Sequence, residues 1–128
     1  MLKRKKTLII AEVGTNHNGS IKTALSMIRK IAKAGADAIK FQLANPDNVY
    51  SKNSFKAEYQ KKNTRFKNQY DMLKSLALKN SDTLKLFNHC KKRKIGFLST
   101  AFDIESAKFL SNLKMDFAKI PSGEITNY

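Results

Sequence analysis

Short apolar runs alternate with amphipathic segments along most of this chain. Four runs, at residues 7–11, 36–42, 95–99 and 115–120, are predicted to be strands. The first is apolar and rich in β-branched residues, as is typical of a strand buried on both faces. Hydrophobic residues in the segments between them recur at three- and four-residue spacing, which predicts helices. An order of strand, helix and strand indicates an α/β fold with a parallel sheet.

The helix signals are clearest around residues 21–34. Ser20 or Asn18 is placed to cap this helix, and Gly35 stands where its C-terminus favours a left-handed residue. A short helix is predicted near Tyr70, and another helix over 104–112. A further helix follows the cap signal at 80–82, and its buried face is predicted to carry Leu84, Phe87 and Cys90.

Residues 43–67 break the alternation, because they are polar and rich in lysine and asparagine. We expect a long excursion with one short helix. A connection of this length inside a compact domain is usually functional.

Four parallel strands with right-handed crossovers fit either an open doubly wound sheet or part of a barrel. A complete (β/α)₈ barrel takes about 250 residues, and this chain has 128. It stops at a strand end, so we expect a truncated barrel portion that forms one domain over residues 1–128.

The chain is strongly basic, with 25 Lys and Arg residues against 10 Asp and Glu residues, a formal charge of +15. Such a charge is compatible with nucleic-acid binding, but the lysines are scattered, and no Arg-rich stripe or stacking-aromatic motif is present. We therefore expect no nucleic-acid partner; the positive field favours anionic substrates instead. One cysteine excludes an intramolecular disulfide. No run reaches the ~20 apolar residues that cross a bilayer, so a cytoplasmic protein without a membrane partner is expected.

Polar side chains gather where the predicted strands end. The carboxyl ends of parallel strands form the active face of α/β folds. The chain brings the following residues to that face: Glu12; Lys40 and Gln42; Ser99 and Thr100; Lys119, Ser122 and Glu124.

Lys40 and Lys119 are the most informative, because lysine is rare in buried strands without a partner. Two lysines suit a phosphate and a carboxylate on one small substrate, and Schiff-base chemistry is another use. Each lysine could also merely end a strand. Glu12 and Glu124 could bind sugar hydroxyls, move a proton or neutralise a lysine. His17 is more simply read as a structural hydrogen-bond partner.

Together these residues resemble the sialic acid synthase family. The resemblance rests on four ordered blocks, IAEVGTNHNG at 10–19, AGADAIKFQ at 34–42, FLSTAF at 97–102 and KIPSGEITNY at 119–128, and on YQKKNT at 59–64. It implies a (β/α)₈ barrel that condenses phosphoenolpyruvate with N-acetylmannosamine and releases phosphate. It further implies a divalent metal, Mn²⁺ or Mg²⁺, that polarises the sugar aldehyde, and a homodimer when the enzyme is complete.

Carried over by position, the resemblance assigns phosphoenolpyruvate contacts to Lys40, Thr100, Lys119 and Ser122. It assigns sugar contacts to Glu12, Gln42, Asn63 and Glu124. Glu124 would stand near the reacting carbons as a candidate for proton transfer, and Lys119 is the second residue that we expect to be catalytic.

There are departures from the family. Ala101 replaces its usual proline, and neither its two metal-binding histidines nor its antifreeze-like domain lies in these residues. We therefore expect that the 128-residue polypeptide alone lacks synthase activity. Sister synthases that make legionaminic acid, pseudaminic acid or N-acylneuraminate 9-phosphate remain alternatives. A non-catalytic basic binding module is the alternative from another class.

Overall fold

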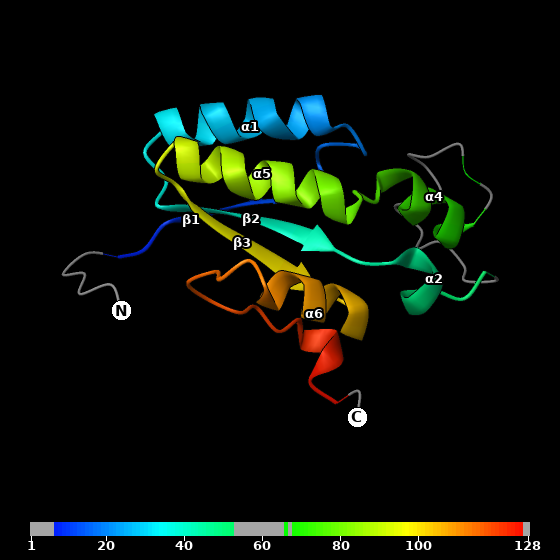
Figure 1. Ribbon diagram of the computed structural model, residues 1–128. Coiled ribbons are helices and arrows are strands. Elements are labelled where there is room, and N and C mark those ends of the chain that lie inside the picture. The colour runs from blue at the N-terminus through cyan, green and yellow to red at the C-terminus, as the bar shows by residue number, and fades with distance from the viewer. Residues whose placement is uncertain (1–6, 53–65, 67, 127–128) are drawn as a thin grey trace.

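A computed structural model describes residues 7–52, 66 and 68–126 of the chain, and in these a parallel sheet is flanked by helices (Figure 1). The elements run in the order β1 (Ile10–Gly14), α1 (Ile21–Lys33), β2 (Ala38–Leu43), α2 (Pro46–Val49), α4 (Gln69–Leu76), α5 (Asn80–Lys92), β3 (Gly96–Ala101), α6 (Ile104–Ser111) and a 3₁₀ turn, η1 (Ser122–Glu124). The predicted α/β class and parallel sheet are confirmed.

The sheet has the order β1-β2-β3, and both pairs of strands are parallel. Successive residues of a strand face opposite sides of the sheet. On one side Ile39 pairs with Phe97, and both are buried. The polar residues Lys40 and Gln42 lie on the other side. The sheet therefore separates a packed face from a face that carries the candidate chemistry.

Helices α1 and α5 lie side by side over the packed face (Figure 1). Their inward residues Ile28, Leu86 and Cys90 are fully buried. The ring of Phe97 stacks on Phe41 with centroids 5.8 Å apart and meets Phe87 edge-on at 5.7 Å, both favourable aromatic geometries. This core fixes the direction of β2 and β3.

Local signals set the ends of α1. The Ser20 side chain accepts a hydrogen bond from the Thr23 N–H, so Ser20 rather than Asn18 is the cap. At the other end Gly35 has φ +87°, the left-handed conformation that glycine adopts without strain.

The fourth predicted strand, residues 115–120, is wrong as an element. In the described part of the chain it is reduced to one bridge, between Thr100 and Lys119. Phe117 and Ile120 are 46% and 66% exposed, not buried on both faces. The segment has a strand on only one side and makes a single bridge with it, so it does not form a continuous ladder.

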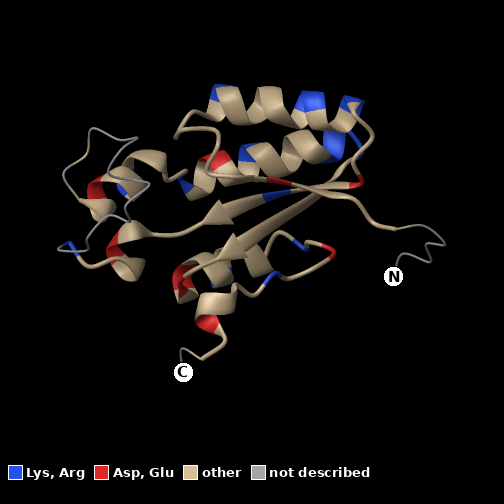
Figure 2. Cartoon of the chain, turned by 180° about the vertical axis from the view of Figure 1, so that it is seen from behind, with Lys and Arg blue, Asp and Glu red and all other residues tan. Residues whose placement is uncertain are grey.

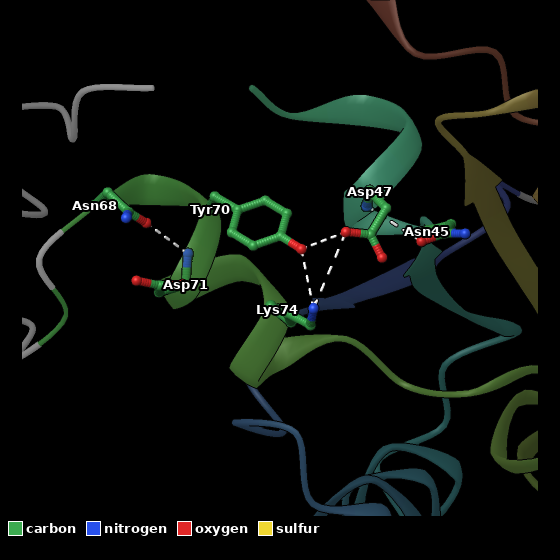
Figure 3. Close-up of polar contacts among 6 residues, drawn as sticks. All are labelled: Asn45, Asp47, Asn68, Tyr70, Asp71 and Lys74. Carbon is green, nitrogen blue, oxygen red and sulfur yellow. Dashed lines mark hydrogen bonds and ion pairs between the residues drawn. The ribbon is translucent and has the colours of Figure 1, made fainter. Parts of the chain in front are cut away.

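Helix α2, inside the excursion, and α4, which follows it, are held together by a small polar cluster of Asp47, Tyr70 and Lys74 (Figure 3). The Tyr70 hydroxyl donates to the Asp47 carboxylate, and the Lys74 ammonium donates to the same hydroxyl at 2.9 Å. Tyr70 is itself buried. The cluster fixes α4 against the loop that follows β2.

Charges are distributed unevenly over the described elements. Lys and Arg are frequent on α1 and α5, whereas α2, α6 and η1 carry acidic residues (Figure 2). None of the helices in the described ranges is long and apolar enough to span a bilayer.

Candidate active site

Strand pairing places five of the predicted site residues on one face of the sheet. Glu12 pairs with Lys40, Gln42 pairs with Thr100, and Thr100 bridges to Lys119. Register partners in neighbouring strands share a face, as do residues two apart in one strand. The shared face follows directly from this pairing, although Glu12 and Lys40 lie in the middle of β1 and β2 and not at their ends as predicted.

Lys40 and Glu12 form the charged centre of this face. The Lys40 ammonium contacts the Glu12 carboxylate, and the two side chains are 19% and 45% exposed. A lysine this shielded needs a compensating charge, and Glu12 supplies it. Of the three roles considered for Glu12, neutralising a lysine is the one whose contact the structure contains.

Gly14 brings Glu12 and Gln42 close to the same point. The ladder between β1 and β2 is irregular between Glu12 and Gly14, and Gly14 has φ +52°. A Cβ atom at Gly14 would lie 3.2 Å from the Glu12 Oε1 atom and 3.3 Å from the Gln42 Nε2 atom. The two predicted sugar-binding side chains therefore approach each other over the bare backbone of this glycine.

The other predicted residues lie further along the same edge. Thr100 is buried. Lys119 is exposed, and its ammonium donates to the Ile120 carbonyl at 2.8 Å. Ser122 opens η1 and Glu124 closes it. Convergence of the Lys40 and Lys119 ammonium groups on one ligand stays a prediction, and Asn63 lies outside the described residues.

The loops at this edge are held by Asp103. Its carboxylate accepts hydrogen bonds from the Asn45 N–H at 2.8 Å and from the Ser106 N–H at 2.8 Å. Burial tends to raise the pKa of Asp103, but the bonds from Ser106 and Asn45 outweigh it, so the net pKa is lowered. One carboxylate thereby joins the loop after β2 to the start of α6.

His17 has a structural role, as its position in a glycine-bracketed loop suggested. It is 1% exposed, and its Nδ1 atom accepts from the Gly19 N–H at 3.1 Å. Burial lowers its pKa, against the effect of a hydrogen bond with the Gly14 backbone. The imidazole is therefore neutral near pH 7 and orients the loop after β1.

The described residues do not fit the divalent metal that the resemblance implies. In these ranges no three His, Cys, Asp or Glu side chains form a group that could hold a metal ion. Glu12, the carboxylate at the charged centre, is already paired with Lys40. We therefore assign no chemical step of this chain to a metal.

Two features near this edge were not predicted from the sequence. A cavity of about 870 Å³ lies between α6 and the segment around Lys119 and Glu124, with Asn48 and Ser99 in its wall. A smaller cavity, of about 40 Å³, has Gln42 and Tyr50 in its wall. Neither Asn48 nor Tyr50 ends a predicted strand, so the strand pattern carried no signal for them.

Comparison with known proteins gives a consistent group of relatives. The model of the NeuB family matches residues 3–128. The chain is 47% identical over 124 residues to an N,N'-diacetyllegionaminic acid synthase of Campylobacter jejuni, covering 96% of this chain and 37% of that protein. It is 45% identical over 120 residues to the enzyme of the same name from Legionella pneumophila, covering 93% and 34%.

A solved structure extends the likeness to three dimensions. The chain superimposes with a TM-score of 0.75 and 29% identity on the N-acetylneuraminic acid (sialic acid) synthetase of Leptospira borgpetersenii in complex with citrate. The match covers 94% of this chain and 39% of that one. The chain thus spans between a third and two-fifths of the length of these relatives, and the predicted partial barrel is confirmed.

Proposed function

This chain belongs to the NeuB family, and on that premise we propose that it carries part of the active site of a phosphoenolpyruvate-dependent synthase of sialic-acid-type sugars. The observation that supports this most directly is the shielded Lys40, held by Glu12 beside Gln42 on the open face of the sheet. A fixed cation at the carboxyl edge of parallel strands suits a small anionic substrate.

The proposed reaction forms a carbon–carbon bond. The methylene carbon of phosphoenolpyruvate attacks the aldehyde carbon of an open-chain N-acylated aldose, and the aldehyde oxygen takes up a proton. Water adds to the cationic C2 centre and loses a proton. The C2–O bond to the phosphate then breaks, phosphate leaves with the bonding electron pair, and the new C2 hydroxyl gives its proton to the phosphate to leave a keto group.

The residues of this chain would bind and orient the substrates. Lys40 and Lys119 would hold the anionic groups of phosphoenolpyruvate, with the Thr100 and Ser122 hydroxyls as further donors. Such preorganised charge stabilises the transition state more than the same charge in water would. Glu124 would move the proton at the aldehyde oxygen, and Glu12, Gln42 and Asn63 would contact the sugar. The metal ligands and the dimer partner expected from the resemblance would come from outside these residues.

The acceptor is the finer question. The resemblance to the sialic acid synthase family implies N-acetylmannosamine as the acceptor. The identities of 47% and 45% to two N,N'-diacetyllegionaminic acid synthases support the aldose that leads to legionaminic acid. We propose that aldose as the preferred acceptor, with N-acetylmannosamine as the second candidate.

The test is an assay of phosphate release by the synthase that carries this chain. Phosphoenolpyruvate is supplied with either acceptor, and Mn²⁺ or Mg²⁺ is present. Lys40→Met should lower kcat/KM for phosphoenolpyruvate by 100-fold or more, because a lost bond to a charged group costs ~1.5–3 kcal/mol and the Glu12 charge is left unpaired.

Lys85→Met is the matched control. Lys85 also contacts a carboxylate, Asp82, at 2.9 Å, but it lies on α5 and its side chain is 64% exposed. Its replacement should leave the rate unchanged. Absence of phosphate release with both acceptors, or equal losses in the two variants, would refute the proposed function.

A further inference from the structure

Tyr50 stands beside the proposed sugar-binding residues, although it ends no strand and belongs to none of the residues assigned by resemblance. It closes α2, where its N–H donates to the Pro46 carbonyl at 3.1 Å. Asp47, in the same short helix, is fixed by Tyr70. The backbone that carries the Tyr50 side chain is therefore anchored on the α4 side.

The Tyr50 side chain is half-buried and lines the cavity of about 40 Å³ together with Gln42. The opposite wall is apolar, because α4 and the residue that follows Ala77 contribute Leu73, Leu76 and Leu78. A water molecule occupies about 30 Å³ in the liquid, so the cavity has room for one methyl-sized group. It combines an apolar wall with three polar residues, Thr15, Gln42 and Tyr50.

The phenol is suited to donate a hydrogen bond. Burial, and then the negative charge of Glu124, raise the pKa of Tyr50 above its ordinary value. The hydroxyl is therefore protonated at neutral pH and can donate to a carbonyl oxygen. Gln42 Nε2, which lies close to Gly14 at the same edge, supplies a second donor, an amide N–H that can bind a carbonyl oxygen.

An acetamido group matches these features: a methyl for the apolar wall and a carbonyl oxygen for the donors. We propose that Tyr50 and Gln42, with the apolar wall from α4, form the subsite that receives an N-acetyl group of the acceptor sugar. This inference rests on the proposed function. It makes Tyr50 a residue that determines acceptor specificity rather than one that takes part in bond formation.

The test compares an N-acetylated acceptor with its counterpart that bears a free amine, using the synthase that carries this chain. Tyr50→Phe should lower kcat/KM for the acetylated acceptor about tenfold, the effect of one hydrogen bond of ordinary strength. The kcat/KM values for the free-amine counterpart and for phosphoenolpyruvate should change by less than about twofold. The readout is the ratio of the kcat/KM values for the two acceptors, because a general loss of folded enzyme lowers both values equally.

Two further variants complete the design. Ser81→Ala also removes one side-chain hydroxyl, but Ser81 is exposed on α5 and does not line the cavity, so it should leave the ratio of the two acceptors unchanged. Ala44→Val adds two methyl groups to a residue of the cavity wall. It should lower the ratio independently of Tyr50, so it tests the subsite even if Tyr50→Phe fails to fold.

Three results would overturn the inference. An unchanged ratio in Tyr50→Phe and Ala44→Val, with an active parent enzyme, would reject the subsite and leave the proposed function standing. An equal fall for both acceptors would show that Tyr50 only supports the fold. A parent enzyme that releases no phosphate with any acceptor would reject the proposed function and the subsite with it.

Discussion

Replacing Gly19 by alanine is expected to destabilise the protein more than the same replacement at Gly35. Both glycines have left-handed backbones, with φ +72° and +87°, and this conformation costs an L residue about 1–2 kcal/mol. Their surroundings differ. A Cβ atom at Gly19 would lie 2.3 Å from the Ser75 carbonyl oxygen, whereas among the described residues no heavy atom beyond the two chain neighbours would lie within 4 Å of one at Gly35.

The size of the stability loss in Gly19→Ala depends on which part of the backbone must move to relieve the contact. The Ser75 carbonyl belongs to the backbone of α4, so relief of the contact requires α4 to shift away from the loop after β1. Overpacking of this kind costs about 1–3 kcal/mol. The free energy of unfolding should therefore fall by about 2–5 kcal/mol for Gly19→Ala and by about 1–2 kcal/mol for Gly35→Ala.

Urea unfolding followed by circular dichroism measures both values in the same protein. Gly14→Ala is an informative third variant, because its Cβ would meet only the side-chain ends of Glu12 and Gln42. It should cost about as much as Gly35→Ala, yet raise the KM for the acceptor sugar. Equal losses at Gly19 and Gly35 would refute the argument that the Ser75 carbonyl closes the space beside Gly19.

Two further predictions concern titratable groups. Asp103→Asn should lower the free energy of unfolding by about 1–2 kcal/mol at pH 7, through weaker capping of α6. Because the folded pKa of Asp103 is lowered, its charge stabilises the protein above the unfolded pKa of about 3.9, and this is lost as pH falls through the folded value. The difference in free energy of unfolding between parent and variant, measured by urea titration, should therefore become smaller below about pH 4. A difference that stays constant with pH would contradict this. The Cys90 thiol is fully buried, and burial raises its pKa to about 12. Iodoacetamide at pH 8 should therefore label Cys90 only after unfolding, as read by mass spectrometry, and rapid labelling of the native protein would contradict its burial.

The helices could be predicted from the sequence because their signals are local. Ser20 and Gly35 bound α1 through side-chain and backbone chemistry that operates within a few residues. The buried face of α5 was harder to predict. Leu84 is 43% exposed, and Leu86 is buried in its place, because contact with α1 and the sheet selects one of two apolar stripes that the spacing allows.

Strand boundaries depend on partners that lie far away in the sequence. The first strand was predicted at residues 7–11 but occupies Ile10–Gly14, because pairing with β2 extends the ladder past the apolar run into Glu12 and Gly14. The segment at 115–120 shows the opposite case. Its composition favours a strand, but it makes only one bridge to β3. In both places, pairing with a neighbouring strand and not intrinsic β propensity decides where the strand forms.

The chemistry of the candidate site could also be predicted only in part from the sequence. That Glu12 and Lys40 belong to two successive parallel strands follows from the sequence, but their direct contact depends on register and on the irregularity at Gly14. The contact changes how Lys40 can act. An anion that arrives at Lys40 meets an ammonium whose charge Glu12 already balances, so the anion must share or displace that carboxylate. Repulsion between Glu12 and the anion would weaken binding of phosphoenolpyruvate, while Glu12 balances the charge of Lys40 when the site is empty. A second cation such as Lys119 is therefore a requirement of this geometry for a substrate that carries two anionic groups.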